Sequence, residues 1–361
     1  MNIGIIYGMG EKKIVGVSNA FIGIMQEILK MDLNNEYYSL YDNYYKLPMH
    51  IEKNIIKTND FNENYDYYCF LHNIDILHSY WEAFYGIKSK CYKILTCYDL
   101  IPLVKKEWHP GLYDYFNESL RHSAQEADKI IAISEYTKKD LVNYYNLKPE
   151  KIEVIYLGNK EQKIDRKKED NREKNIIPIE EEYILGVSSL VKYKNFDRMV
   201  EAFILFKERH RHSNLKLIIT GKTAWDGLNK KSIVSYRNYE KDIIFTGYID
   251  DYSLSLLYKN ALAFVYVSLY EGFGLPILEA MGHGKAVVCS NTTSMPEVGG
   301  EAVEYCNPYE IDSIQQAIEK VVLNDVYRKE LEQKAIIQSK HFSYHKAAEK
   351  TIEIYKNALK G

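Results

Sequence analysis

Short apolar runs rich in β-branched and aromatic residues alternate with runs of helical periodicity along this chain. The strand-like runs are residues 3–7, 67–71, 92–96, 130–134 and 153–156 in the first half and 183–187, 215–220, 243–246, 263–267 and 286–289 in the second. The helical runs are residues 18–30, 136–145 (with Ser134 as N-cap), 195–210 and 253–260. Such alternation is typical of parallel sheets covered by helices on both faces. The sequence therefore predicts an α/β fold.

A highly charged stretch, residues 160–175, divides the chain into two halves. It has almost no apolar residues, which is typical of an exposed linker. The 361 residues are enough for two domains of ordinary size. We therefore expect a first domain over residues 1–176, including the linker 160–176, and a second over residues 177–342. Residues 343–361 follow with the pattern of an amphipathic helix.

Composition narrows the class of protein. Hydrophobic residues make up 46% and charged residues 27%, a globular balance, and the net charge of −3 gives no electrostatic case for nucleic acid as a partner. No apolar run reaches the length of a membrane span, and the first residues have the pattern of a strand rather than of a cleavable leader. We therefore expect a cytoplasmic protein. The five cysteines lack metal-ligand spacing and are expected to be buried, reduced thiols.

Two glutamates flank a glycine-rich turn in the segment Tyr-Glu-Gly-Phe-Gly-Leu-Pro-Ile-Leu-Glu-Ala-Met, residues 270–281. The segment follows a predicted strand, and Pro276 suits the first turn of a helix, where a missing N–H costs nothing. Glu271 is thus expected on a loop and Glu279 in the first turns of that helix. The start of a helix offers N–H groups and partial positive charge to a diphosphate, and carboxylates accept hydrogen bonds from sugar hydroxyls.

This segment resembles the retaining glycosyltransferases of family 4. The resemblance is strong over residues 183–308, weaker before residue 92, and includes Gly282, Gly284 and residues 245–248, 254–261, 286–291 and 294–300. It implies the GT-B fold: two Rossmann-like domains facing each other across a cleft, with the last helix returning to pack on the first domain. It also implies an acceptor-binding first domain, a second domain that binds a nucleotide-sugar donor, and a reaction with no cofactor and no metal.

The resemblance implies roles for residues of the second domain. Glu271 and the backbone of Gly272, Phe273, Gly274 and Leu275 would hold the donor sugar, and Glu279 would hold the ribose. Lys194 would bind the diphosphate and stabilise charge on the leaving group. Ser189 stands where many members carry a phosphate-binding Arg, so a second cation would come from Lys192 or Lys222. Gly221, Lys222 and Tyr248 lie in loops that line the nucleotide pocket of relatives. A helix-surface Glu279 and a solvated Lys194 are the plain alternatives.

Two positions in the first domain complete the candidate set. Tyr98 follows a predicted strand where many relatives have a histidine near the reacting sugar. With a reference pKa of about 10, a tyrosine is a poor general base, which fits a retaining reaction in which the leaving phosphate takes the acceptor proton. Gly16 lies in residues 14–19, which resemble the family's glycine loop. A packed tyrosine and an ordinary strand–helix turn are the competing interpretations.

The sequence thus favours a metal-independent hexosyltransferase, with GDP-mannose as the first candidate donor and a glycan or lipid-linked glycan as acceptor. A non-catalytic partner subunit and a sugar-nucleotide epimerase or phosphorylase on the same fold remain alternatives. A dinucleotide oxidoreductase is excluded because the first strand–helix turn lacks its glycine motif. Aromatic, aliphatic and lysine residues at 37–57 predict weak peripheral membrane contact, unless this segment is a loop packed on its own domain. Asp250 and Asp251 are expected to cap a helix rather than bind a metal.

Overall fold

The computed structural model describes residues 1–7, 15–40, 56–57, 65–80, 84, 87–159, 181–221 and 239–358. They form two compact units: Met1–Gly158 with Phe342–Gly361, and Asn159–His341. We call these the first and second units. The predicted linker at 160–176 and the predicted boundary near residue 177 lie outside the described residues. The chain passes between the units at residues 158–159 and again at residues 341–342.

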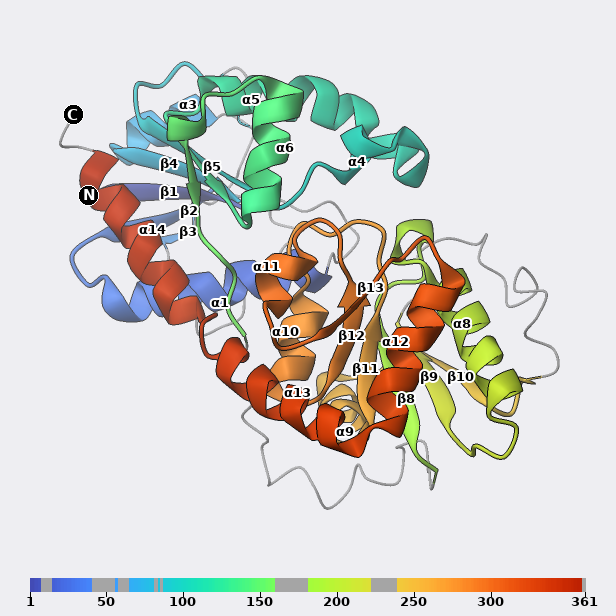
Figure 1. The fold of residues 1–361 in the computed structure, drawn as a ribbon. Coiled ribbons are helices and arrows are strands. Elements are labelled where there is room, and N and C mark those ends of the chain that lie inside the picture. Colours follow the sequence, from blue (N-terminus) through green and yellow to red (C-terminus); the bar gives the residue numbers. More distant parts are fainter. Residues whose placement is uncertain are drawn as a thin grey trace. The chain divides into compact units, whose positions relative to one another are not determined.

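The described part of the first unit contains a parallel sheet in the order β3-β2-β1-β4-β5-β6-β7. Helices α1 and α14 lie on one face, and α5 and α6 on the other (Figure 1). Its strands are β1 (Asn2–Ile6), β2 (Glu36–Leu40), β3 (Ile56–Lys57), β4 (Ile76–Tyr80), β5 (Tyr92–Cys97), β6 (Lys129–Ala132) and β7 (Ile152–Val154). Its helices are α1 (Val15–Met31), α3 (Tyr65–Leu71), α4 (Ile101–Val104), α5 (Arg121–Glu126), α6 (Glu135–Tyr145) and α14 (Tyr344–Ala358).

Helix α14 is built into the first unit although it follows the second unit in the chain. Its buried residues recur at helical spacing, and they include Tyr344 and Tyr355. The Tyr344 ring packs on α1 at Gly23, where a Cβ would lie 2.4 Å from Cε2 of the ring. The Tyr355 hydroxyl lies 2.7 Å from Nδ1 of His78 in β4. Apolar packing therefore attaches this helix to α1, and a buried polar contact attaches it to the sheet.

The described part of the second unit contains a parallel sheet in the order β10-β9-β8-β11-β12-β13. Helices α8 and α12 cover one face, and α10 and α11 lie on the other (Figure 1). Its strands are β8 (Tyr183–Val187), β9 (Lys216–Thr220), β10 (Ile243–Gly247), β11 (Ala263–Tyr266), β12 (Val287–Ser290) and β13 (Glu304–Cys306). Its helices are α8 (Phe196–Arg209), α9 (Asp251–Asn260), α10 (Leu275–Gly282), α11 (Met295–Gly299), α12 (Ile311–Leu323) and α13 (Asp325–Ser339).

The predicted α/β class is confirmed, and so are several local signals. Ser134 Oγ accepts a hydrogen bond from the N–H of Thr137 and caps α6. Asp250 caps α9 by accepting from the N–H groups of Tyr252 and Ser253. The five cysteines are free, and all except the half-buried Cys91 are buried. Among the described residues, none of the helices combines the length and apolarity that crossing a bilayer requires.

One predicted strand is wrong, because residues 67–71 belong to helix α3. Its aromatic residues suggest a strand, but only Tyr68 and Cys69 are buried in the helix, while Tyr67 and Phe70 are exposed. The side chain of Asp66, in the first turn, accepts hydrogen bonds from the N–H groups of residues 88 and 89. Packing on one side and a carboxylate in the first turn outweigh the β-propensity of the aromatic residues. Strands β2, β3, β4 and β13 were not predicted.

Candidate active site in the second unit

The topology of the second unit brings two predicted segments to the same place. All strands of its described sheet are parallel, so their carboxyl ends lie along one edge. Strands β8 and β11 are neighbours, with β9 and β10 on one side and β12 and β13 on the other. Open parallel sheets bind ligands where the strand order reverses in this way. The loops after β8 and β11 carry Lys194 and Glu271, respectively.

Lys194 and Glu271 form an ion pair at this reversal point. Lys194 Nζ lies 2.7 Å from Oε1 and 2.9 Å from Oε2 of Glu271. The Lys194 and Glu271 side chains are 12% and 9% exposed, so solvent screens this pair little. The hydroxyl of Tyr266, in β11, accepts from Lys194 Nζ at 3.0 Å and donates to Glu271 Oε1 at 2.7 Å. The site thus places a cation and a carboxylate in contact at a ligand-binding position.

The backbone of the Glu271 loop is fixed by two hydroxyl side chains from beyond β12. Thr293 Oγ1 accepts from the N–H of Glu271 at 3.2 Å. Ser294 Oγ is shared between the carbonyl oxygens of Glu271 and Phe273, at 3.0 and 2.9 Å. Gly272, Phe273 and Gly274 are all buried. These contacts hold the loop backbone in one conformation beside the ion pair.

The loop that carries Lys194 is held by its neighbour Asn195. The 3-10 turn Lys192–Lys194 ends at Asn195, which has a positive φ of 61°. Its buried amide donates to the carbonyl oxygens of Val267 and Pro308, at 2.9 and 2.8 Å. The loop after β8 is thereby tied to the loop after β11. Ser189 lies at the start of this loop, where its carbonyl accepts from the N–H of Val191 at 2.9 Å.

Gly221 directly follows strand β9 and has a backbone conformation that residues with a side chain rarely adopt. Its φ is +146°, and a Cβ there would lie 1.8 Å from the carbonyl oxygen of Ser188. Its N–H donates to the carbonyl of Gly247 at the end of β10, at 3.0 Å. Tyr248 follows and is 61% exposed. Lys222 lies outside the described residues.

Helix α10 begins directly after the Glu271 loop. Gly274, its N-cap, has a φ of +108°, and Leu275 and Pro276 form the first turn. N–H groups at the start of a helix have no partners within the helix and favour an anion. Glu279, half-buried one turn later, accepts from the buried Tyr258 hydroxyl at 3.2 Å. The two predicted glutamates therefore flank the start of this helix, and each is contacted by a buried tyrosine.

Gly16 was expected in a loop between the first strand and the first helix, and the structure places it elsewhere. Helix α1 begins at Val15, so Gly16 lies in its first turn rather than in a loop before it. A Cβ at Gly16 would meet no atom within 4 Å. The helix was predicted to start at residue 18, because Gly16 has a low helix propensity. It starts three residues earlier, since the residues that follow Gly16 favour the helix. The role of Gly16 toward a ligand stays a prediction.

Tyr98 lies just beyond the end of β5 and is 2% exposed. Burial, and next the neighbouring tyrosines Tyr80, Tyr7 and Tyr344, raise the pKa of Tyr98 well above its ordinary value. The hydroxyl therefore keeps its proton at neutral pH and is not a base. Its predicted role near the reacting sugar stays a prediction, beside the alternative of a packed tyrosine.

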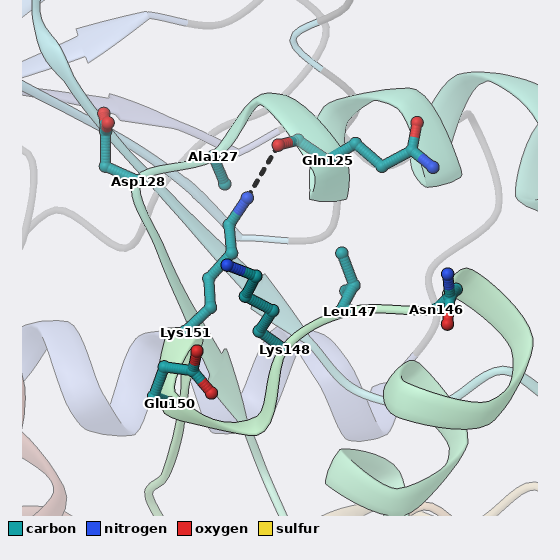
Figure 2. Close-up of a pocket in the computed structure, with 8 residues that line it drawn as sticks. All are labelled: Gln125, Ala127, Asp128, Asn146, Leu147, Lys148, Glu150 and Lys151. Atoms are coloured by element: carbon teal, nitrogen blue, oxygen red, sulfur yellow. Dashed lines mark hydrogen bonds between the residues drawn. The ribbon is translucent and has the colours of Figure 1, made fainter.

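A hollow of about 570 Å³ lies elsewhere in the first unit. Figure 2 shows that its lining comes from the segments that lead into β6 and β7, at the amino ends of these strands. Lys151 Nζ donates across it to the carbonyl of Gln125 at 2.6 Å. Its lining residues are Gln125, Ala127, Asp128, Asn146, Leu147, Lys148, Glu150 and Lys151. None of them is a predicted site residue, and the hollow lies at the edge opposite the carboxyl ends of the strands.

The contacts that position Lys194 and the two glutamates were not predicted from the sequence. They involve Tyr258, Tyr266, Thr293, Ser294 and Asn195. Thr293 and Asn195 both have a positive φ, at 55° and 61°. No local sequence pattern predicts this conformation at either residue. Tyr266 lies in an apolar run and has the pattern of a core residue. Within the described residues, no group of three His, Cys, Asp or Glu side chains is placed to hold a metal ion.

Comparison with known proteins identifies the family of this chain. A family model described as "Glycosyl transferases group 1" matches residues 167–357, and one described as "Glycosyltransferase Family 4" matches residues 35–160. The O-antigen chain mannosyltransferase B of Escherichia coli is 31% identical over 271 residues, which cover 73% of this chain and 70% of that protein. The serotype-specific mannosyltransferase WbdA of Escherichia coli is 30% identical over 274 residues, 74% of this chain but only 33% of that protein.

Solved structures show the same architecture. A glycosyltransferase from Rickettsia africae ESF-5 has a TM-score of 0.73 at 19% identity, covering 100% of this chain and 99% of that one. At this identity the likeness concerns the fold. The family models and the mannosyltransferase at 31% identity go further: this chain belongs to the group 1 glycosyl transferases of glycosyltransferase family 4, and it has their GT-B fold.

Proposed function

We propose that this glycosyltransferase moves a mannosyl group from a nucleotide-diphosphate sugar, first of all GDP-mannose, to a hydroxyl of a glycan or lipid-linked glycan, with retention of configuration. The observation that carries the proposal is the meeting of Lys194 and Glu271 at the strand-order reversal of the second unit. Mannose is favoured because relatives at 30–31% identity are named mannosyltransferases of the O-antigen chain or of a serotype.

The chemistry needs positive charge beside the leaving group. In the proposed reaction the bond between the anomeric carbon and the diphosphate oxygen breaks, and the acceptor oxygen bonds to the same face of that carbon. The acceptor proton passes to the leaving phosphate oxygen. Lys194 and the start of α10 would stabilise the charge that develops on the diphosphate. Glu271 would hold the sugar hydroxyls and Glu279 the ribose.

We propose that this reaction needs no metal. Lys194 would supply the charge that a divalent ion supplies in other transferases. Asp250, the acidic residue nearest to a metal-binding pattern, is engaged with the N–H groups of Tyr252 and Ser253. Asp250 is thus the N-cap of α9, and Asp251 is the first residue of that helix.

The acceptor side of the proposal includes weak contact with an anionic membrane through residues 37–57. Tyr37 and Tyr38 are buried in β2, so they do not belong to such a surface. Residues 41–55, with Tyr44, Tyr45 and Lys46, lie outside the described residues. Flotation with vesicles of anionic lipid at low and high salt tests this contact. The triple substitution of Lys46, Lys53 and Lys57 by Glu should abolish it.

The first experiment is a thermal-shift screen of nucleotide sugars, because a ligand that binds the folded state raises the melting temperature. GDP-mannose should give the largest shift, and the anomer of the product, measured by NMR, should match that of the donor. An inverted product would refute retention. Binding without any turnover or release of nucleotide would favour the partner-subunit alternative, and an isomerised donor sugar would favour the epimerase.

A further inference from the structure

Tyr266 closes a triangle of contacts with Lys194 and Glu271. Its hydroxyl accepts from Lys194 Nζ at 3.0 Å and donates to Glu271 Oε1 at 2.7 Å, while the ion pair forms the third side. Burial, and next the Glu271 carboxylate, raise the pKa of Tyr266, so the hydroxyl keeps the proton that it donates. The hydroxyl therefore contacts both charged groups at once.

The three members of this triangle differ in rigidity. Tyr266 is 3% exposed and ends strand β11, where it is paired with Cys289 of β12. Its ring also stacks on that of Phe264, with the centroids 5.9 Å apart and the planes 18° apart. Lys194 instead ends a 3-10 turn, and its ammonium is carried on a flexible four-carbon chain. The tyrosine is the fixed member and the lysine the adjustable one.

Donor binding changes what Lys194 has to do. An ammonium has three N–H donors, and in this structure they are directed to Glu271 and Tyr266. If Lys194 turns toward a diphosphate, Glu271 loses part of its charge partner inside a site where its side chain is 9% exposed. A carboxylate in such a place needs another donor to keep its orientation. The hydroxyl of Tyr266 is already in contact with it.

We propose that Tyr266 is a positioning residue that keeps Glu271 oriented toward the donor sugar while Lys194 moves its charge to the diphosphate. This inference rests on the proposed function for the use of the site. The contacts among the three side chains do not depend on it.

Tyr266→Phe removes the hydroxyl and keeps the ring that fills the core. Tyr183→Phe is the matched control, because Tyr183 is also buried in the second unit, and its hydroxyl donates to the carbonyl of Leu257 at 2.8 Å. Tyr183→Phe loses one buried hydrogen bond and Tyr266→Phe loses two, so the melting temperature of each variant is measured first to show that both proteins are folded. Tyr266→Phe should lower kcat about ten- to a hundredfold with little change in KM for the donor, while Tyr183→Phe keeps both.

A second measurement does not use transferase activity. Acylation of the Lys194 amine by acetic anhydride, followed by peptide mass spectrometry, reports how firmly that amine is held. Lys194 should be acylated several times faster in Tyr266→Phe than in the unsubstituted protein or in Tyr183→Phe. Equal acylation rates together with an unchanged kcat would overturn the proposal. If the unsubstituted protein turns over no nucleotide sugar, the proposed function fails, and the acylation rates still decide whether Tyr266 holds Lys194.

Discussion

His78 in β4 and Tyr355 in α14 are joined by a buried hydrogen bond, with Nδ1 of the imidazole 2.7 Å from the hydroxyl. On the other side of the ring, Nε2 lies 2.8 Å from Thr96 Oγ1 in β5. His78 is fully buried, and this burial lowers its pKa from 6.5 to about 3. The imidazole is therefore neutral in the folded protein at every pH near neutrality.

This burial predicts a loss of stability in mild acid. Below pH 6.5 the unfolded chain binds a proton at His78, whereas His78 in the folded protein stays neutral until the pH falls to about 3. The free energy of unfolding should therefore fall by up to about 1.4 kcal/mol per pH unit within this window. Denaturant unfolding at several pH values measures it. In His78→Gln the free energy of unfolding should decline less steeply with falling pH. In the control His345→Gln, which changes an exposed histidine of α14, the decline should be as steep as in the unsubstituted protein. Parallel curves for all three proteins would contradict the prediction.

Lys194→Met should lower turnover more than it lowers binding of the nucleoside. The lysine acts on charge that grows as the diphosphate leaves, and guanosine carries no phosphate. Calorimetry should give similar affinities for guanosine in both proteins and a weaker affinity for GDP in the variant. Lys259→Met, an exposed lysine of α9, is the control for loss of a positive charge. Equal losses for guanosine and GDP would indicate that Lys194 supports packing instead.

Glu279→Ala should weaken nucleotide binding by about 1.5–3 kcal/mol, through lost hydrogen bonds to the ribose. Tyr258→Phe should have a smaller effect in the same direction, since the Tyr258 hydroxyl contacts the Glu279 carboxylate at 3.2 Å. Glu208→Ala, an exposed glutamate of α8, controls for the change in net charge. The assignment fails if calorimetry finds the affinity of Glu279→Ala for GDP unchanged.

Alanine should have opposite effects at two glycines of the predicted site. Gly221→Ala should destabilise the second unit, because its φ is +146° and the new Cβ would lie 1.8 Å from the Ser188 carbonyl oxygen. Gly16→Ala should raise stability by up to about 1 kcal/mol, because alanine favours the helix and its Cβ meets no atom. Melting temperatures check both. A stable Gly16→Ala variant with lost activity would show that a ligand approaches this backbone.

Activity should survive a chelator. The positive charge that the reaction needs is assigned to Lys194 and to the start of α10, so EDTA should leave the initial rate unchanged. Dialysis against EDTA followed by assays with and without magnesium or manganese provides the measurement. Activity that disappears and returns with either ion would refute the assignment.

The sequence predicted those parts of the molecule that depend on local pattern. The apolar run of β8 was predicted with the same bounds as the structure, and the Asp250 cap followed from a single residue type at a helix start. Strand β4 was not predicted because His78 and Ser79 interrupt its apolar run. His78 is tolerated there because it has buried hydrogen-bonding partners in other elements: Thr96 in β5, 18 residues later, and Tyr355 in α14, 277 residues later.

In the candidate site, too, the residues of a local motif were predicted, whereas their partners from other elements were not. Lys194, Glu271 and Glu279 were predicted from a motif and a family resemblance, and the structure places the first two in contact. The tyrosines that contact the glutamates were not, since a tyrosine in an apolar strand or helix is most often a core residue. Only the pairing of β11 with β8 brings the Tyr266 hydroxyl to the lysine of the next loop.

The place of α14 has a consequence for synthesis. The first unit is discontinuous in the chain, since residues 342–361 belong to it and the second unit is inserted before them. The second unit is continuous, so the ribosome synthesises all of it before it synthesises α14, the helix that completes the first unit. Until then, the apolar surface that Tyr344 covers at Gly23 is open, and His78 lacks its Tyr355 partner. The domain that begins first is completed last, so a nascent chain that stalls before residue 344 leaves its earliest-made domain exposed to aggregation.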